Sequence, residues 1–176
     1  MNDRRLNRNR MMNDDRGISL VELIVVIAIM AVMVGITSFA VGMMFSRDAN
    51  YVAVRIDDEM TEARTLAMSK AGKFRYEFHI DSDPKNSYVR IIDLDNPDPP
   101  VRNVPLNKSV TVKVNGAAAS DFSLMFDKAK GNVIQVNGSD SAIEKVYTIE
   151  VTSVRNTSKV KTVSLITTTG RHYTDK

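Results

Sequence analysis

The feature that most constrains this chain is a continuous run of 24 residues without a charged side chain, from Leu23 to Ser46. An α-helix over this run would be roughly 36 Å long at about 1.5 Å per residue, which exceeds the roughly 30 Å hydrocarbon core of a bilayer. A buried helix of a soluble domain seldom extends so far without a charge. The run therefore predicts a membrane-spanning helix.

The charges before this run predict its orientation. Residues 1–17 carry five arginines and three aspartates and show no apolar periodicity. Positively charged flanks stay on the cytoplasmic side, so we expect a single-pass protein of the cytoplasmic (inner) membrane, with its N-terminus inside and residues 47–176 outside. A secretory signal has a shorter apolar core and a small-residue cleavage site after it. We therefore expect residues 18–46 to remain in the mature protein.

Glu22 is the one ionisable side chain in the apolar stretch that begins at Ile18. A carboxylate inside a membrane is costly and invites a functional interpretation with a partner group. The alternative is that Glu22 lies near the lipid headgroups and is simply solvated. The apolar stretch alone leaves both interpretations open.

The residues around Glu22 resemble the prepilin signal of the type IV pilin-like family, which includes type IV pilins, competence pilins and type II secretion pseudopilins. The resemblance lies in the basic leader ending in Gly17, the apolar Ile18, Glu22 at the fifth position after the leader, and the long apolar helix. It implies cleavage between Gly17 and Ile18, N-methylation of Ile18, and pairing of Glu22 with the Ile18 amine of a neighbouring subunit. The implied partners are a prepilin peptidase/methyltransferase, other pilin or pseudopilin subunits, the cytoplasmic membrane and an assembly platform.

The helix is predicted to continue beyond the apolar run as an amphipathic segment over residues 47–71. Apolar residues recur there at spacings of three and four, which defines one narrow stripe, and Gly72 follows as a stop signal. We expect this stripe to pack on a sheet. Its members are Val52, Ile56, Met60, Ala63 and Ala67.

From Lys73 onward the apolar period changes to two, which is typical of strands. The first predicted strand covers 74–80. Others are expected at 87–94, 109–115, 121–126, 132–136, 145–154 and 159–168, with turns at 83–84, 115–116, 130–131 and 137–138 and a proline-rich loop ending at 105. The predicted fold class is α+β: a long N-terminal helix, its first half transmembrane, packed on an extracytoplasmic antiparallel β-sheet domain of residues 72–176. This is the pilin-like architecture.

Three further segments resemble the GspH/FimT-like minor pseudopilins. Residues 60–67 contain an A-R pair on the helix, residues 126–131 lead from Phe126 to Gly131, and residues 163–170 end in Thr169-Gly170. This resemblance implies a minor subunit at or near the tip of a type II secretion pseudopilus or a type IV pilus-like filament, serving protein secretion or a related surface function.

The sequence contains no pattern for catalysis, metal binding or a cofactor. Cysteine is absent, which excludes disulfides and thiol chemistry, and His79 and His172 are the two histidines. No phosphate-binding glycine loop is present. We therefore expect a subunit that is not an enzyme and has neither metal nor cofactor.

The last quarter of the chain is basic, with Arg155, Lys159, Lys161 and Arg171 as candidate phosphate contacts. These residues favour a second hypothesis, a competence-type minor pilin that binds DNA, although a solvated surface explains the same charges. A third hypothesis is a membrane-tethered β domain with no role in a filament.

Overall fold

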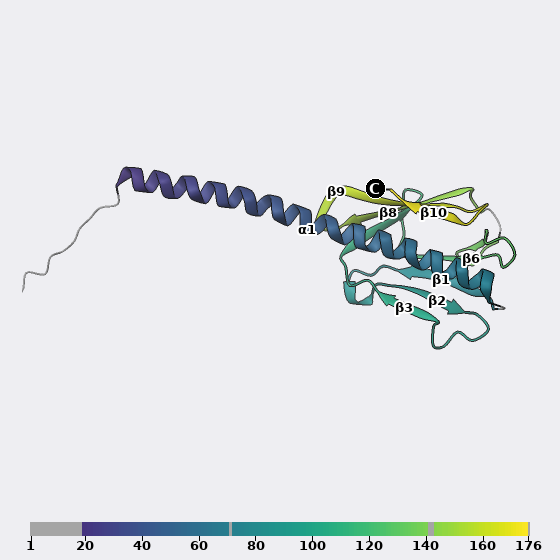
Figure 1. Ribbon diagram of the computed structural model, residues 1–176. Coiled ribbons are helices and arrows are strands. Elements are labelled where there is room, and N and C mark those ends of the chain that lie inside the picture. Colours follow the sequence, from purple (N-terminus) through teal and green to yellow (C-terminus); the bar gives the residue numbers. More distant parts are fainter. Residues whose placement is uncertain (1–18, 71, 141–142, 176) are drawn as a thin grey trace, which may run out of the picture. The chain divides into compact units, whose positions relative to one another are not determined.

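The computed structural model describes residues 19–70, 72–140 and 143–175, and of residues 37–46 it describes only the backbone. The chain divides into two units, residues 1–39 and 40–176. Helix α1 (Leu20–Ser69) begins in the first unit, ends in the second, and is continuous through Gly35 and Gly42 (Figure 1). The predicted long helix is confirmed, with its end two residues before Ala71.

The part of α1 in the second unit buries one face in the core of the β domain. All five residues of the predicted stripe are buried, and Ala49, Ala53 and Leu66 are buried beside them. Complete burial of a side chain such as that of Ile56 contributes about 1.5–3 kcal/mol. The stripe therefore supplies much of the free energy that holds α1 on the strands.

The β domain comprises two antiparallel five-stranded sheets. The first has the order β3-β2-β1-β6-β7. Its strands are β1 (Phe74–His79), β2 (Tyr88–Asp93), β3 (Arg102–Pro105), β6 (Asp121–Phe126) and β7 (Val133–Val136). Phe74, Tyr76 and Phe78 alternate inward to the core, while Arg75, Glu77 and His79 face outward. The short helix η1 (Pro84–Asn86) connects β1 to β2.

The second sheet has the order β10-β9-β8-β4-β5. Its strands are β4 (Val110–Val114), β5 (Ala117–Ala118), β8 (Val146–Ser153), β9 (Asn156–Ile166) and β10 (Arg171–Thr174). Asn115 and Gly116 both have positive φ, of 50° and 80°, and form a two-residue hairpin turn between β4 and β5. This is the turn that an Asn-Gly pair predicts.

Seven predicted strands are confirmed, and three strands were not predicted. β3 lies within the expected proline-rich loop and ends at Pro105, which an edge strand tolerates. β5 consists of two alanines, and β10 is a four-residue edge strand without apolar alternation. The last predicted strand was also placed three residues too late, because β9 begins at Asn156, ahead of its apolar alternation.

Candidate functional site

Glu22 lies in the first turn of α1, and its side chain is exposed. The amide of Leu23 donates to the carbonyl of Ser19 at 3.0 Å, which fixes the start of the helix. A carboxylate here interacts favourably with the partial positive charge of a helix N-terminus. Gly17 and Ile18, the predicted cleavage and methylation positions, lie outside the described residues.

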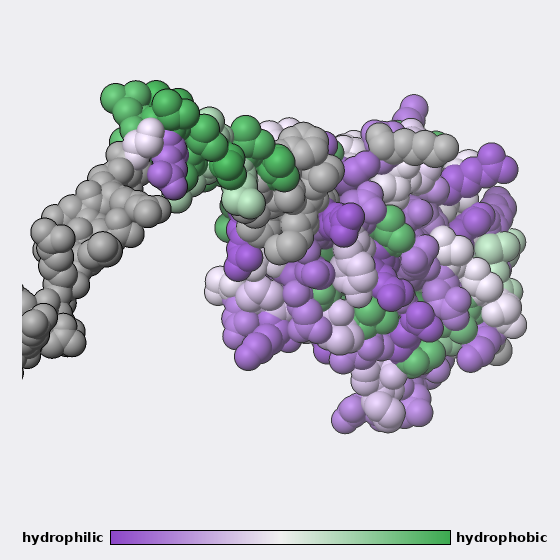
Figure 2. Space-filling model, turned by 60° about the vertical axis from the view of Figure 1, so that its left-hand side comes forward, coloured by the Kyte–Doolittle hydropathy of each residue, from purple (hydrophilic) through white to green (hydrophobic). Residues whose placement is uncertain are grey.

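The first unit exposes large apolar side chains on all faces of α1 between Leu20 and Ile36. Leu20 and Ile36 are 72% and 67% exposed, and these residues form the green surface of the helix in Figure 2. Apolar surface of this extent marks contact with another protein or with a membrane. Among the described residues, no helix is both long enough and apolar enough to span a membrane.

In the second unit, Arg64 connects α1 to a turn of each sheet. Its Nε donates to the carbonyl of Gly131 at 2.9 Å, in the β6–β7 turn, and its Nη2 donates to the carbonyl of Thr169 at 3.1 Å, in the β9–β10 turn. The hydrogen bond to Gly131 is partly buried and contributes about 1.5–3 kcal/mol, whereas the one to Thr169 is exposed and contributes less. We call Arg64, Gly131, Thr169 and Gly170 the Arg64 junction.

Two glycines make the Arg64 junction sterically feasible. Gly170 has a φ of 64°, and a Cβ there would lie 1.8 Å from the carbonyl oxygen of Gly131. Gly131 has a φ of 65°, and a Cβ there would lie 2.8 Å from Nε of Arg64. The Arg64 junction thus brings together the three segments whose sequences resemble the GspH/FimT-like subunits.

A second polar contact joins α1 to the edge of the first sheet. Glu59 is 1% exposed, on the same helix face as the apolar stripe, and its Oε2 lies 2.6 Å from Nε of Arg102 in β3. Its other oxygen, Oε1, is buried without a hydrogen-bond partner among the described residues. Burial, together with the charge of Glu59, raises the pKa of Tyr76 well above its ordinary value. The guanidinium of Arg102 thus supplies the positive charge that offsets the buried carboxylate of Glu59.

Asp57 faces the second sheet. Nε2 of His172 lies 3.9 Å from Oδ1 of Asp57 and 2.8 Å from the hydroxyl oxygen of Thr61, so β10 meets α1 through polar groups. Burial raises the pKa of the Asp57 carboxyl, and the charge of His172 partly opposes that shift.

The sequence contains a signal for Glu59, because its spacing of three from Ile56 and four from Ala63 places an acidic residue on the apolar face of the helix. Asp57 lacks such a pair of spacings from the residues of the predicted stripe.

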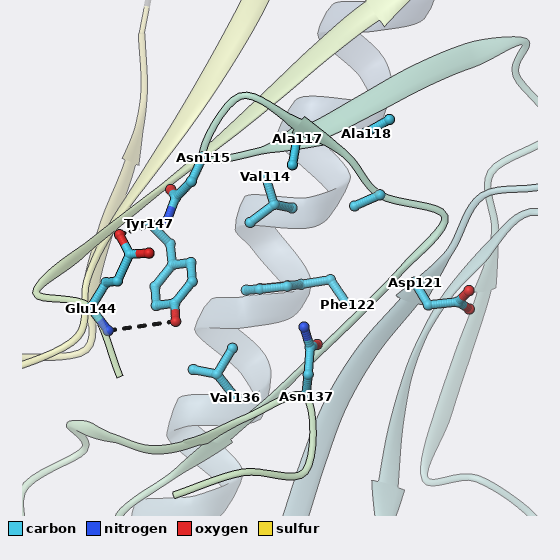
Figure 3. A pocket seen from close by; sticks show the side chains of 11 residues that line it. Val114, Asn115, Ala117, Ala118, Asp121, Phe122, Val136, Asn137, Glu144 and Tyr147 are labelled. Carbon is cyan, nitrogen blue, oxygen red and sulfur yellow. Dashed lines mark hydrogen bonds between the residues drawn. The ribbon is translucent and has the colours of Figure 1, made fainter. Parts of the chain in front are cut away.

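A pocket of about 490 Å³ lies between the β4–β5 hairpin, the start of β6 and the end of β7. Val114, Phe122, Val136 and Tyr147 surround it, as Figure 3 shows. The rings of Phe122 and Tyr147 are 5.7 Å apart, and both side chains are nearly fully buried. These walls belong to the core, and their lining offers no cluster of titratable groups aimed at a ligand.

The structure separates the four basic residues of the DNA-binding hypothesis. Arg155 lies in the β8–β9 turn, and Lys159 and Lys161 lie in the adjoining part of β9. Arg171 pairs with Ile166, at the far end of β9, about 16 Å along the strand from Lys161 at about 3.3 Å per residue. Three of the residues share one hairpin, and Arg171 does not join them.

The N-terminal segment matches the family model of the prokaryotic N-terminal methylation motif over residues 12–38, a range that includes Gly17, Ile18 and Glu22. The fold resembles the crystal structure of the type IV minor pilin FimU of Pseudomonas aeruginosa (strain PAO1), with a TM-score of 0.50 and 14% sequence identity, covering 74% of this chain and 90% of that chain. The comparison with curated proteins gave no match.

Two features of the chain point to pilin-like proteins. The chain carries a prepilin-type methylation motif at its N-terminus, and behind it has the pilin fold, a long α-helix packed on antiparallel sheets. In fold it is similar to a type IV minor pilin.

Proposed function

We propose that this chain is a minor pilin or pseudopilin, processed between Gly17 and Ile18 and assembled through α1 into a type IV pilus-like or type II secretion-like filament. The observation that carries the proposal is the conjunction of a methylation motif, an exposed apolar helix with Glu22 in its first turn, and a pilin-fold domain. The contacts of the Arg64 junction favour the GspH/FimT-like branch and, with it, a position at or near the filament tip.

Processing would change the charge at the start of the helix. Hydrolysis of the Gly17–Ile18 bond removes the arginine-rich leader and leaves an α-amino cation on Ile18, which methylation retains as a cation. Ile18 precedes Glu22 by four residues, or about 6 Å of helix axis. A neighbouring subunit displaced by about that rise would bring its Ile18 amine level with Glu22, so the ion pair would select one register of assembly.

The membrane is part of this proposal. We infer that residues 18–46 hold the subunit in the cytoplasmic membrane, with residues 47–176 outside, until a platform transfers it to the filament. The exposed apolar surface from Leu20 to Ile36 supports this inference. A carboxylate inside the membrane is costly without a counter-ion, which would drive Glu22 toward its partner on assembly.

The test compares Glu22→Gln and Glu22→Ala with the conservative Glu22→Asp in cells that make the whole machine. All three variants should be cleaved after Gly17, as mass spectrometry of the mature N-terminus reports. Glu22→Gln and Glu22→Ala should lower the amount of the chain in sheared fibres at least tenfold, because neither offers an anion to the neighbour's amine, whereas Glu22→Asp should retain part of it. Normal incorporation of Glu22→Ala would refute the pairing mechanism, and an intact leader on fibre-borne protein would refute the proposal itself.

A further inference from the structure

Strand β4 is paired along its length on one side only. It pairs with β8 from Val110 to Val114, but with β5 only at Lys113 and Val114. The carbonyl of Ser109 accepts from the amide of Val154 at 3.1 Å, which shows that odd-numbered positions bond toward β8. Alternate residues of an antiparallel strand direct their backbone groups to opposite sides. Val110 and Val112 therefore direct theirs away from β8.

Little of the chain covers this other side. The amide of Ala119 donates to the carbonyl of Val112 at 3.0 Å, and the chain then crosses to the first sheet, where the carbonyl of Ser120 accepts from the amide of Ile80 at 2.7 Å. In the ranges that the structure describes, no strand pairs with β4 beside Val110. Val110 is only 5% exposed, but its amide and carbonyl lie on an unpaired strand edge, which is a template for another strand.

A groove of about 630 Å³ runs along this open edge. We call it the β4-edge groove; it is lined by residues 80–82, 109–112 and 118–120 and by Val154. Val154, which is 56% exposed, and Ile80 and Ala118 give it apolar walls. The stretch from Val110 to Val112 offers an edge of about 10 Å, enough for three residues of an extended chain.

Asp81 is the one charged residue among those that line the β4-edge groove. Its Oδ1 accepts from the amide of Asp83 at 2.8 Å and from the hydroxyl of Ser82 at 3.0 Å. These hydrogen bonds hold the pKa of the Asp81 carboxyl below its ordinary value. Its Oδ2 lies 3.7 Å from Nε2 of His79, whose Nδ1 lies 2.6 Å from Oδ1 of Asp121, so that one imidazole is shared between two carboxylates.

We propose that the β4-edge groove binds an extended, basic segment of a neighbouring pilin-like subunit, which adds as a strand to the free edge of β4. Main-chain hydrogen bonds would come from the amide and carbonyl of Val110 and from the amide of Val112, whose carbonyl already accepts from Ala119. Apolar contacts would come from Ile80 and Val154, and a counter-ion for a lysine or arginine of the segment from Asp81. The inference rests on the proposed function, because it requires a neighbouring subunit.

Three residues of strand pairing make a weak contact between free molecules. Assembly through α1 changes this, because it holds the neighbour close and raises its effective concentration at the groove. The β4-edge groove would therefore determine which subunit lies next to this one in the filament, while α1 contributes the affinity that is common to all subunits. Such a division of roles gives a minor subunit a defined neighbour.

The experiment places a photo-crosslinking amino acid at Thr111, which is exposed and lines the groove, in the full chain expressed with its assembly machinery. Tyr173, which is exposed on β10 at the opposite edge of the same sheet, is the control position. After irradiation, adducts from the fibre fraction are digested and sequenced by mass spectrometry. We expect Thr111 to capture a subunit that carries a prepilin motif, through a segment containing lysine or arginine.

Two neighbouring alanines provide matched variants. Ala118→Trp fills the β4-edge groove and should reduce the adduct at least tenfold, whereas Ala117→Trp, on the other face of β5, should leave it unchanged because Ala117 lines only the pocket of Figure 3. Asp81→Asn keeps an oxygen for the amide of Asp83 but removes the charge, and should reduce the adduct severalfold.

Several results would overturn the inference. They are the absence of an adduct at Thr111 in fibres that contain the processed chain, equal capture from Tyr173, an adduct that Ala118→Trp does not reduce, and capture of lipid or of a protein without a prepilin motif. The N-terminus and fibre content are measured on the same samples. A chain that keeps its leader or stays out of fibres contradicts the proposed function, and this inference with it, whereas a processed and assembled chain without the adduct contradicts the groove alone.

Discussion

Replacing Arg102 by methionine isolates the buried carboxylate of Glu59. The substitution Arg102→Met keeps most of the side-chain stem and removes the guanidinium, whose Nε lies 2.6 Å from Oε2 of Glu59. Glu59 is 1% exposed, and its Oε1 has no hydrogen-bond partner among the described residues. After the substitution, the carboxylate would face the buried hydroxyl of Tyr76 and the apolar stripe without a counter-charge.

The expected cost follows from distance and exposure. Two unit charges about 4 Å apart interact by about 4 kcal/mol at an effective dielectric constant of about 20, and breaking a buried pair by removing one partner costs about 3–5 kcal/mol. The side chain of Arg102 is 49% exposed, so water screens the pair and lowers the figure. We expect Arg102→Met to lower the free energy of unfolding by about 2–3 kcal/mol.

The assay is chemical denaturation of the full chain in detergent, followed by circular dichroism because the chain has no tryptophan. A double-mutant cycle with Glu59→Gln should show a coupling energy of about 2 kcal/mol, because the neutral amide no longer needs the cation. Arg90→Met is the matched control: Arg90 pairs with Glu77 on the outward face of the first sheet, where Glu77 is 16% exposed and keeps Arg75 as a second cation at 3.1 Å. Its loss should therefore cost only about 1 kcal/mol. A coupling energy near zero, or an Arg102→Met cost equal to that of Arg90→Met, would refute the reasoning.

Two other substitutions and one titration test the packing of α1 and the two sheets. Gly170→Ala places a Cβ 1.8 Å from the carbonyl oxygen of Gly131. It should lower the free energy of unfolding by at least about 2 kcal/mol more than Gly116→Ala, because Gly116 also has a positive φ but has open space around it. Denaturation midpoints measure both substitutions, and equal losses would contradict the close packing at Gly170. Asp57→Asn should stabilise the protein at neutral pH, because burial raises the pKa of Asp57 in the folded state. The protonated Asp57 carboxyl stabilises the native protein at low pH, and this contribution to the free energy of unfolding is lost as the pH rises through the raised pKa. The Asp57→Asn protein should therefore be no more stable than the native protein below about pH 4. Free energies of unfolding measured as a function of pH test this. Finally, an ultraviolet titration should show Tyr76 ionising only with unfolding, because burial raises its pKa; if the late step is unchanged in Tyr76→Phe, the assignment to Tyr76 is wrong.

Local periodicity was enough to predict the elements that form the core. The stripe from Val52 to Ala67 repeats at helical spacing and is buried as expected, and the Asn115-Gly116 pair marks its hairpin because both positions require positive φ. The alternation of apolar and polar residues from Phe74 onward predicted β1, because one face of this strand is buried. In each case a few neighbouring residues carry the whole signal.

Elements whose stability comes from distant partners were not predictable in this way. β3 is held by Arg102 reaching Glu59, more than forty positions earlier, and β10 by His172 reaching Thr61. Neither short edge strand has a periodic apolar pattern of its own. The open edge of β4 was equally invisible, because it depends on where the chain crosses from β5 to the other sheet.

The Arg64 junction has a consequence for the order of events in folding. Arg64 belongs to α1, whereas Thr169 follows it by 105 residues in the sequence. The helix therefore acquires its second turn contact only after the chain has been made as far as Thr169, whatever the route of export. A product clipped before Thr169 would lack this contact between α1 and the second sheet.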